Sequence, residues 1–366
     1  MNFPTNYKDI IERVENISPK RYCKNRNFID GDVTYLSPYI SRGVISTKLI
    51  YDNCIKKGYD LSEIEKFVQE LAWRDYWQLL WLENDINIDL KRLQPDINNN
   101  EISLNITKAQ SGIEIIDQVI NGLYETGYIH NHIRMYIASI CCNISKSNWR
   151  NPAKWMYYYL LDGDLASNSL SWQWVAGANS NKKYYANQEN INKYTYSNQR
   201  NTFLDHSYEK ITDMSIPNEL EKRILFDEKT ILPKSDNLII NPNIQTCIYN
   251  YYNLDPLWRA SNKANRILIL EPSIYEKYPI SKKCMDFMLE LSKNIENIQI
   301  FAGEYTELTK LIINNNIYYK EHPLNSHYTG KKESRDWLTN VKGNYTSFFK
   351  YWNKAKKELK KTGLNE

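Results

Sequence analysis

The chain has 366 residues, of which 42% are hydrophobic and 25% charged, and its formal net charge is +4. This length suffices for two domains with large cores, and the composition is ordinary for a soluble globular protein. The small positive charge permits nucleic-acid binding without arguing for it. No apolar run approaches the roughly 20 residues of a membrane span, which excludes an integral membrane protein of the helical class.

The six cysteines are scattered and include no C-x-x-C pair; they are Cys23, Cys54, Cys141, Cys142, Cys247 and Cys284. This spacing argues against a zinc or iron–sulfur site, so no metal is expected, and free thiols suit a reducing compartment. Residues 1–7 lack the charged and apolar regions of a signal peptide. We therefore expect a cytoplasmic protein, and a monomer, without membrane contact.

The first predicted helix covers residues 7–14, and Tyr22 follows it. In the segment 30–40, Thr34 and Ser37 flank a predicted helix start that has Pro38 in its first turn. Hydroxyl groups and free backbone N–H groups at such a start can hold phosphate. A plain N-cap is the alternative interpretation of this segment.

Residues 64–82 show the helical period and predict a strong amphipathic helix. Within it, Glu70, Trp73, Arg74 and Trp77 share one face, at i, i+3, i+4 and i+7. Such a face is a poor core stripe and a poor solvated surface, but it fits a half-buried pocket wall that holds a base by stacking and hydrogen bonding. The alternative is an ion pair between Glu70 and Arg74 beside two partly packed indoles.

A polar, loop-like stretch at 85–107 precedes a predicted helix at 111–123, and the next helix starts near residue 126. His130 and His132 lie two residues apart, about 200° around a helix, so they are not expected to share a metal ion. The residues that do share a face of this helix are Asn131, Arg134, Met135 and Ala138.

Residues 162–174 combine two acids, an amide and two indoles with several small residues; they are Asp162, Asp164, Asn168, Trp172 and Trp174. Small residues let the backbone approach a flat molecule, the polar side chains can hydrogen-bond a heterocycle, and indoles can stack or pass electrons. The alternative is a surface loop followed by a core helix.

The pattern changes after Pro233. Short apolar runs at 238–240, 266–270, 298–301 and 317–319 read as buried strands, and 283–294 and 304–313 read as helices. The predicted fold is therefore mainly α, followed by a small α/β domain with a parallel sheet. The predicted domains are 1–232 (helical), 233–343 (α/β, Rossmann-like) and 344–366 (a basic helix). A glycine-rich phosphate loop is absent from the α/β part, so dinucleotide binding is not predicted there, and the lysine-rich stretch 350–361 is expected to be a solvated helix.

Four segments, taken in order, resemble the FAD-binding domain of the DNA photolyase and cryptochrome family. Residues 34–40 resemble T-x-L-S-P-Y-L, 70–76 resemble E-L-x-W-R-E-F-Y, 126–135 resemble T-G-W-x-H-N-R-x-R-M, and 162–174 complete the set. The resemblance implies a helical domain with FAD as its cofactor. In ordinary photolyases an α/β antenna domain precedes the flavin domain, and residues 269–272, 301–304 and 344–352 faintly resemble parts of it. A circular permutation is therefore a hypothesis, with an unrelated α/β appendage as the alternative, and an antenna chromophore is left open.

The resemblance also implies residue roles. For FAD it implies contacts from Tyr22, Thr34, Tyr35, Leu36, Ser37, Arg74, Asn131, Arg134, Asp162, Asp164 and Asn168, with Asn168 facing flavin N5. For the damaged bases it implies contacts from Glu70, Trp73, Asn131, Met135 and Trp174, and it gives Glu70 the further role of stabilising the dimer radical anion. Trp172 and Trp149 match the inner and middle tryptophans that photoreduce the flavin. The outer one has no equivalent, so Trp155 or a tyrosine is another candidate exit. His132 replaces an arginine of the family pattern.

The function that the resemblance implies is that of a deoxyribodipyrimidine photo-lyase, which splits cyclobutane pyrimidine dimers in UV-damaged DNA with light. Enzymes that repair (6-4) photoproducts have histidines where this chain has Asn131 and Met135, so the cyclobutane type is expected. Two alternatives are a cryptochrome-like blue-light photoreceptor without repair and a helical interaction protein with a decayed pocket.

Overall fold

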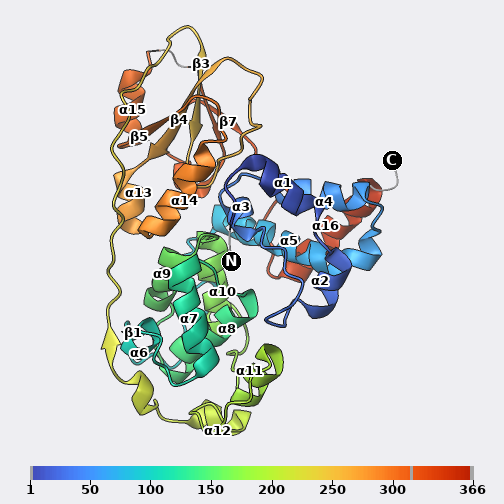
Figure 1. Cartoon of the computed structure of the whole chain (residues 1–366), viewed down its shortest axis with the longest axis vertical. Coiled ribbons are helices and arrows are strands. Elements are labelled where there is room, and N and C mark those ends of the chain that lie inside the picture. The colour runs from blue at the N-terminus through green and yellow to red at the C-terminus, as the bar shows by residue number, and fades with distance from the viewer. Residues whose placement is uncertain (1–2, 314–315, 363–366) are drawn as a thin grey trace. The chain divides into compact units, whose positions relative to one another are not determined.

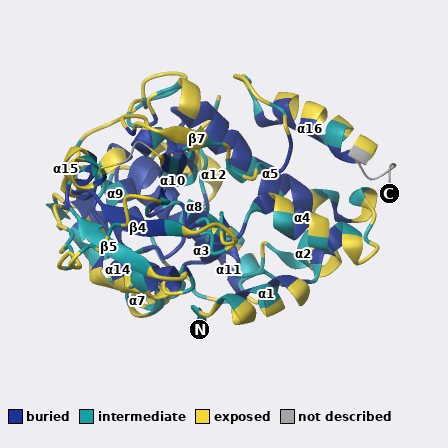
Figure 2. Ribbon diagram, turned by 90° about the horizontal axis from the view of Figure 1, so that it is seen from above, coloured by how far each residue is buried: buried dark blue, intermediate teal, exposed yellow. Residues whose placement is uncertain are grey.

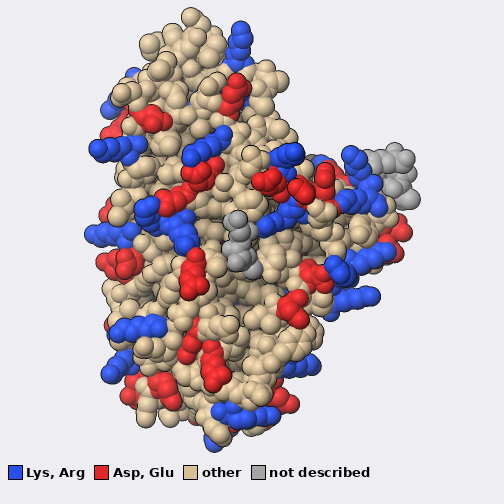
Figure 3. All heavy atoms as spheres, viewed as in Figure 1, with Lys and Arg blue, Asp and Glu red and all other residues tan. Residues whose placement is uncertain are grey.

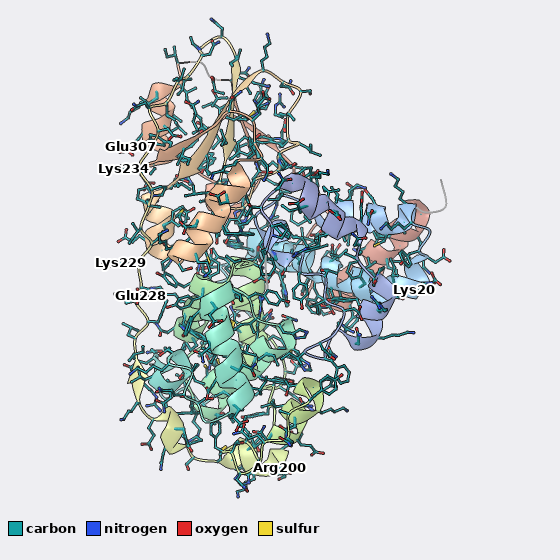
Figure 4. The ribbon with its side chains drawn as sticks, in the orientation of Figure 1. Lys20, Arg200, Glu228, Lys229, Lys234 and Glu307 are labelled. Carbon is teal, nitrogen blue, oxygen red and sulfur yellow. The ribbon has the colours of Figure 1, made fainter. Side chains whose placement is uncertain are left out.

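A computed structural model describes residues 3–313 and 316–362 (Figure 1). The chain forms two compact units, and each is built from separate stretches of sequence. The α/β unit comprises Met1–Pro19, Thr34–Tyr76 and Lys229–Glu366, and the helical unit comprises Lys20–Val33 and Trp77–Glu228. The passage between the units at Glu228 and Lys229, both labelled in Figure 4, lies close to the predicted boundary at 232. The predicted domains are continuous, whereas these units are not.

The helical unit consists mainly of short helices. Its elements, with α2 at its border, are α2 (Pro19–Asn25), β1 (Ile102–Ser103), α6 (Leu104–Thr107), α7 (Glu114–Thr126), α8 (Asn131–Ser139), the π-helix η1 (Ile140–Ile144), α9 (Arg150–Tyr159), α10 (Leu165–Ala176), α11 (Gln188–Thr195), α12 (Tyr208–Asp213), η2 (Asn218–Leu220) and β2 (Arg223–Ile224). The strands β1 and β2 pair antiparallel. The predicted helices at 111–123 and from residue 126 onward correspond to α7 and α8.

The core of the helical unit follows from helical periodicity. On α7, Ile116, Ile120 and Leu123 recur at i, i+4 and i+7 and are fully buried against α8 and α9. The helix α7 ends at Gly127, whose φ of +72° is left-handed and where a Cβ would come within 2.6 Å of Leu161 Cγ. A glycine is thus required both by the backbone conformation and by the close approach of Leu161.

The long helix α5 (Leu61–Glu83) begins in the α/β unit and continues into the helical unit. The α/β unit also contains α1 (Tyr7–Glu15), α3 (Ser37–Ser41), α4 (Thr47–Lys56) and α16 (Phe348–Thr362). Of these, α5 contacts α3, α4 and α16. The predicted helices at 7–14 and 64–82 are confirmed. In the C-terminal stretch a helix is confirmed, but full solvation is wrong, because α16 buries Tyr351, Trp352, Ala355 and Leu359 on one face (Figure 2). The last four residues of the predicted range 344–366 lie outside the described residues.

The remainder of this unit is a five-stranded parallel sheet in the order β5-β4-β3-β6-β7. Its elements are β3 (Gln245–Tyr249), β4 (Ala264–Leu270), α13 (Pro272–Lys277), α14 (Lys282–Ser292), β5 (Ile298–Ala302), α15 (Tyr305–Leu311), β6 (Ile317–Lys320), η3 (Pro323–Asn325) and β7 (Lys331–Glu333). The parallel α/β prediction is confirmed. The helices α13 and α14 connect the neighbouring parallel strands β4 and β5, whereas α15 leads from β5 to β6 on the other side of β3. The inner strand β4 is almost entirely buried, but every residue of the edge strand β5 is only partly buried.

One predicted strand is wrong. Residues 238–240 form no strand; they lie along the edge of β5, where Gln299 Oε1 accepts the N–H of Ile239 at 2.6 Å, and Ile239 is exposed. The central strand is β3, which the sequence pattern did not reveal. The strand β3 begins with the polar residues Gln245 and Thr246, so its sequence shows no continuous apolar run. These residues are buried because strands lie on both sides of β3. Among the described residues, no helix has the length and apolar character needed to cross a membrane.

Candidate functional site

The turn at residues 34–37 belongs to the α/β unit and starts α3 as predicted, with Pro38 in the first turn. The plain side-chain N-cap is not what forms there. Leu36 occupies the N-cap position without a capping side chain, Tyr35 takes a left-handed φ of +53°, and Thr34 Oγ1 accepts the N–H of Leu36 at 3.4 Å. A left-handed tyrosine costs about 1 kcal/mol, so the neighbouring contacts must hold this turn in place.

The face of α5 that carries Glu70, Trp73 and Arg74 also lies in the α/β unit. Arg74 donates from Nη1 to Ser41 Oγ at 2.8 Å, which ties α5 to the last residue of α3. Helical geometry places Trp77 on the same face, as predicted. The guanidinium is thereby held at the end of the same short helix that starts at Ser37.

The indole of Trp73 stacks on Phe348, the first residue of α16. The ring centroids are 3.8 Å apart and the planes differ by 9°. Phe348 is buried, whereas Trp73 remains partly exposed. Sequence reasoning missed Phe348, although the cluster of aromatic residues at 345–352 was a signal that this stretch packs against something flat.

Asp75 anchors the C-terminal segment to α5. It is buried, and its carboxylate accepts from Thr47 Oγ1 at 3.1 Å and from the N–H of Leu338 at 2.7 Å. Burial raises the pKa of Asp75 to about 6, although both hydrogen bonds oppose the shift. Asp75 therefore stabilises the fold less as the pH rises, because its buried carboxyl group must then carry a charge.

In the helical unit, Arg134 and Asp162 form a buried ion pair. Arg134 Nη2 lies 3.0 Å and 2.9 Å from the two carboxylate oxygens, and Nε donates to the carbonyl of Ile129 at 2.9 Å. The Asp162 side chain is only 4% exposed. Its charge is balanced by one guanidinium, whose own orientation is fixed by the backbone.

Asp164 accepts hydrogen bonds at both carboxylate oxygens. Its Oδ1 accepts the N–H of Ser167 at 2.7 Å, as the N-cap of α10, and its Oδ2 accepts from Gln78 Nε2 at 2.6 Å. Gln78 is buried and was missed from the sequence, although it lies one turn beyond Arg74 on α5. Between the two acids, a Cβ at Gly163 would lie 3.0 Å from the carbonyl oxygen of Leu160, so this turn is tightly packed.

The start of α10 has unused hydrogen-bonding capacity. The buried Ser167 Oγ has no hydrogen-bond partner among the described residues. Its neighbour Asn168 donates from Nδ2 to the carbonyl of Ala153 at 3.0 Å, which fixes the orientation of the amide. We call Arg134, Asp162, Asp164, Ser167 and Asn168, with Gln78, the polar cradle. A buried hydroxyl without a partner beside fixed carboxylates fits a polar ligand such as FAD.

The predicted electron-transfer tryptophans lie in the core of the helical unit. Trp149 and Trp172 are buried in one apolar cluster, and Trp149 donates from Nε1 to Asp89 at 2.8 Å. Trp155 belongs to the same cluster and donates to Tyr124 Oη at 3.1 Å. Trp174 is exposed, and its indole is tilted against Tyr184.

The predicted face of α8 begins at its first residue. Asn131 is exposed, and Met135 packs partly buried against the core of the helical unit. Tyr22 lies on α2 and is partly buried. The predicted site residues are therefore divided between the α/β unit and the helical unit. Within the helical unit, Arg134 contacts Asp162 directly.

The two histidines beside Asn131 have separate structural roles. His130 caps α8 through Nδ1, which accepts the N–H of His132 at 3.2 Å, and burial lowers the pKa of His130 to about 4. The ring of His132 packs against Tyr136 and Tyr194, and its Nδ1 lies 2.8 Å from Asn27 O. Within residues 3–313 and 316–362, no group of three or more His, Cys, Asp or Glu side chains could hold a metal ion.

Residues 67–206 match the sequence model of a family described as the FAD binding domain of DNA photolyase. A deoxyribodipyrimidine photo-lyase of Alkalihalophilus pseudofirmus is 27% identical over 252 residues, which are 62% of this chain and 52% of the relative. One of Buchnera aphidicola is 31% identical over 180 residues, 45% of this chain and 38% of the relative. A cryptochrome structure from Synechocystis aligns with a TM-score of 0.46 and 21% identity over 53% of this chain and 44% of that one. The chain thus spans about half the length of the first relative and less of the second.

Proposed function

We propose a function from the premise that this chain belongs to the DNA photolyase and cryptochrome family, whose FAD-binding domain it carries. The proposed function is that of a deoxyribodipyrimidine photo-lyase, which splits cyclobutane pyrimidine dimers in UV-damaged DNA with light. The observation that carries the proposal is the polar cradle, because its buried carboxylates are held in place within the segment that matches the family. A cytoplasmic monomer remains the predicted working form.

The residues proposed to contact FAD follow from the family resemblance and are given for each unit by itself. In the helical unit they are Tyr22, Asn131, Arg134, Asp162, Asp164 and Asn168, and in the α/β unit they are Thr34, Tyr35, Leu36, Ser37 and Arg74. When bound and reduced, FAD supplies the light-driven electron, and the protein supplies binding and orientation.

Each cradle residue has a proposed task. Arg134 orients the Asp162 carboxylate, and Gln78 orients that of Asp164, so that both can accept hydrogen bonds from the cofactor. Asn168, whose amide is oriented by Ala153, is proposed to face flavin N5. Ser167 can donate a hydrogen bond that no described residue accepts.

The residues proposed to contact the damaged bases are Glu70 and Trp73 in the α/β unit and, taken separately, Asn131, Met135 and Trp174 in the helical unit. Flipping a dimer from the duplex costs a few kcal/mol. Stacking on Trp73 and Trp174 could offset this cost by roughly 1–3 kcal/mol per base. Glu70 is proposed to hydrogen-bond the dimer and stabilise its radical anion.

Trp172 and Trp149 are proposed to pass the electrons that reduce the bound flavin in light. Their burial in one core supports this role, since buried indoles in a rigid core keep fixed separations. For the missing outer member, Trp155 with its partner Tyr124 is the proposed exit.

We also propose that the α/β part of the chain corresponds to a circularly permuted antenna domain. Two placements support this proposal. Glu271 and Pro272 follow β4 and start α13, and Gly303 and Glu304 follow β5 and start α15. In the resemblance, these two short segments likewise stand at the ends of strands of the antenna domain. An antenna chromophore remains unassigned.

The second candidate is a blue-light photoreceptor of the cryptochrome kind. The distribution of charge favours it, because acidic and basic side chains are interspersed on the face shown in Figure 3 and the net charge is only +4. A protein that binds the DNA backbone strongly would be expected to gather cations on one face.

The decisive test is repair of thymine dimers in a UV-irradiated oligonucleotide by purified, chemically reduced protein, with a dark control. Chemical reduction removes any dependence on the tryptophan chain. Repair in light alone would support the photo-lyase. Flavin-bound protein that repairs nothing in light would leave the photoreceptor, and protein that never binds flavin would contradict both.

A further inference from the structure

Three aromatic rings form a stacked column between α5 and α16. Trp73 of α5 stacks on Phe348 with ring centroids 3.8 Å apart, and Phe348 faces Trp352 at 6.3 Å, with interplanar angles of 9° in both pairs. Phe348 and Trp352 lie one turn apart on α16 and are 3% and 2% exposed. Trp73 at the other end of the column remains partly exposed. The column therefore runs from a buried end to a partly open one.

The buried end of the column is fixed by hydrogen bonds and an ion pair. Trp352 donates from Nε1 to Glu65 Oε1 at 3.2 Å, and Lys356 Nζ lies 2.7 Å from Glu65 Oε2. This ion pair and the Trp352 hydrogen bond outweigh partial burial and lower the pKa of Glu65. The carboxylate of Glu65 thus joins α16 to the start of α5.

Phe348, the middle ring of the column, is also fixed by a contact at its edge. Tyr76 meets the edge of Phe348, with ring centroids 5.8 Å apart and an interplanar angle of 72°, and its hydroxyl donates to the carbonyl of Tyr345 at 3.1 Å. Phe348 can therefore neither tilt nor withdraw without breaking contacts on two sides. A flat, buried ring in a fixed plane restricts the indole stacked on it to the same plane.

We propose that Phe348, backed by Trp352, is a positioning residue that sets the plane of the Trp73 indole for stacking on an unstacked nucleic-acid base. This inference rests on the proposed function and extends the base-binding site to the last helix of the chain. An indole that is already in the stacking plane loses less conformational freedom when a base binds, so the same contact yields a higher affinity. The effect belongs to binding, since Phe348 need not touch the base itself.

The test compares three variants of the full chain on a single-stranded oligonucleotide that carries one thymine dimer. Phe348→Leu keeps an apolar residue but loses the flat ring, and it is expected to weaken binding by about 5-fold, a part of the stacking free energy of one base. Phe348→Tyr keeps the ring and should stay within about twofold of wild type. Phe349→Leu is the matched control, because Phe349 is exposed and meets only the edge of Phe348.

A merely structural role is separated by kinetics and by folding. In the repair assay, Phe348→Leu should raise KM by about 5-fold and leave kcat within about twofold, because only the binding step changes. Folded Phe348→Leu protein that binds the dimer as tightly as wild type would overturn the proposal. If Phe348→Leu does not fold, Trp352→Leu gives the same test, since it removes the ring behind Phe348 and the hydrogen bond to Glu65. It should weaken binding by about 5-fold, and unchanged binding would again overturn the proposal.

The wild-type protein separates this inference from the proposed function. Wild type that does not prefer irradiated over unirradiated DNA and repairs nothing would contradict the proposed function. Wild type that prefers irradiated DNA, with Phe348→Leu showing the same preference and affinity, would contradict only the role of Phe348.

Discussion

The polar cradle and the aromatic column fix the orientation of a functional side chain by different interactions. In the cradle, charged groups are fixed by direct hydrogen bonds, as between Arg134 and Asp162, and most members come from one short segment. In the column, Trp73 is fixed by the flat face of Phe348, which is distant in sequence. The comparison teaches that the cradle should fail abruptly when one partner is lost, whereas the column should weaken in steps.

The largest effect is expected from Arg134→Ala. It leaves the buried Asp162 carboxylate without its guanidinium, which should lower the free energy of unfolding by roughly 3–5 kcal/mol. Urea denaturation measures the loss, and flavin absorbance after purification should fall with it. Arg200→Ala is the matched control, since Arg200, labelled in Figure 4, is exposed and its pair with the partly buried Asp205 should contribute little. Equal stability of the two variants would contradict the role of the Arg134–Asp162 pair.

Asp75→Asn tests the anchor beside the column through pH. Asp75 has a pKa of about 6 in the fold and about 3.8 as its ordinary value, so its stabilising contribution is fully present below about pH 4 and is lost as pH rises through 6. Relative to wild type, the variant should therefore gain up to roughly 3 kcal/mol between about pH 4 and pH 7. Urea denaturation of both proteins across this range measures the difference. A difference that does not change with pH would show that Asp75 is not buried as described.

Gln78→Leu should lower the free energy of unfolding by roughly 1–2 kcal/mol, because Asp164 loses the Gln78 amide as a donor while the N–H of Ser167 remains. Gln78→Glu sharpens the test, since it places a second carboxylate beside Asp164 and should be more harmful at neutral pH than in mild acid. Unfolding of both variants at the two pH values measures this. A Glu variant as stable as wild type at neutral pH would mean that the contact with Asp164 is not maintained.

The smallest effect on stability is expected from Ser167→Ala. Because Ser167 Oγ is buried without a partner, its removal should change the free energy of unfolding of the flavin-free protein by less than about 1 kcal/mol, in either direction. If the hydroxyl serves FAD, the affinity for added FAD should nevertheless fall by about 5-fold. Fluorescence titration with FAD measures the affinity. A variant that is strongly destabilised without flavin would indicate a structural role instead.

Much of the fold was accessible from local patterns. The helical periods at 7–14 and 64–82 and the apolar runs at 266–270, 298–301 and 317–319 correspond to observed elements, although 298–301 is only partly buried. Side-chain periodicity reports which face of an element is buried, and it needs no knowledge of the partner. The wrong strand at 238–240 has the same origin, since an apolar run can also pack along the edge of a sheet without forming a strand, as Leu238 and Ile240 do while Ile239 stays exposed.

Within residues 162–174, the sequence by itself determined the turn, the helix and the grouping of two acids, an amide and two indoles. Spacing along one turn and one helix is enough to bring these side chains together. Tertiary structure alone decided that Gln78 meets Asp164, that Phe348 lies against Trp73, and that β3 is the central strand. These contacts join segments far apart in the chain. Their stabilisation comes from complementary surfaces that form only on folding, and no local period encodes which surfaces will meet.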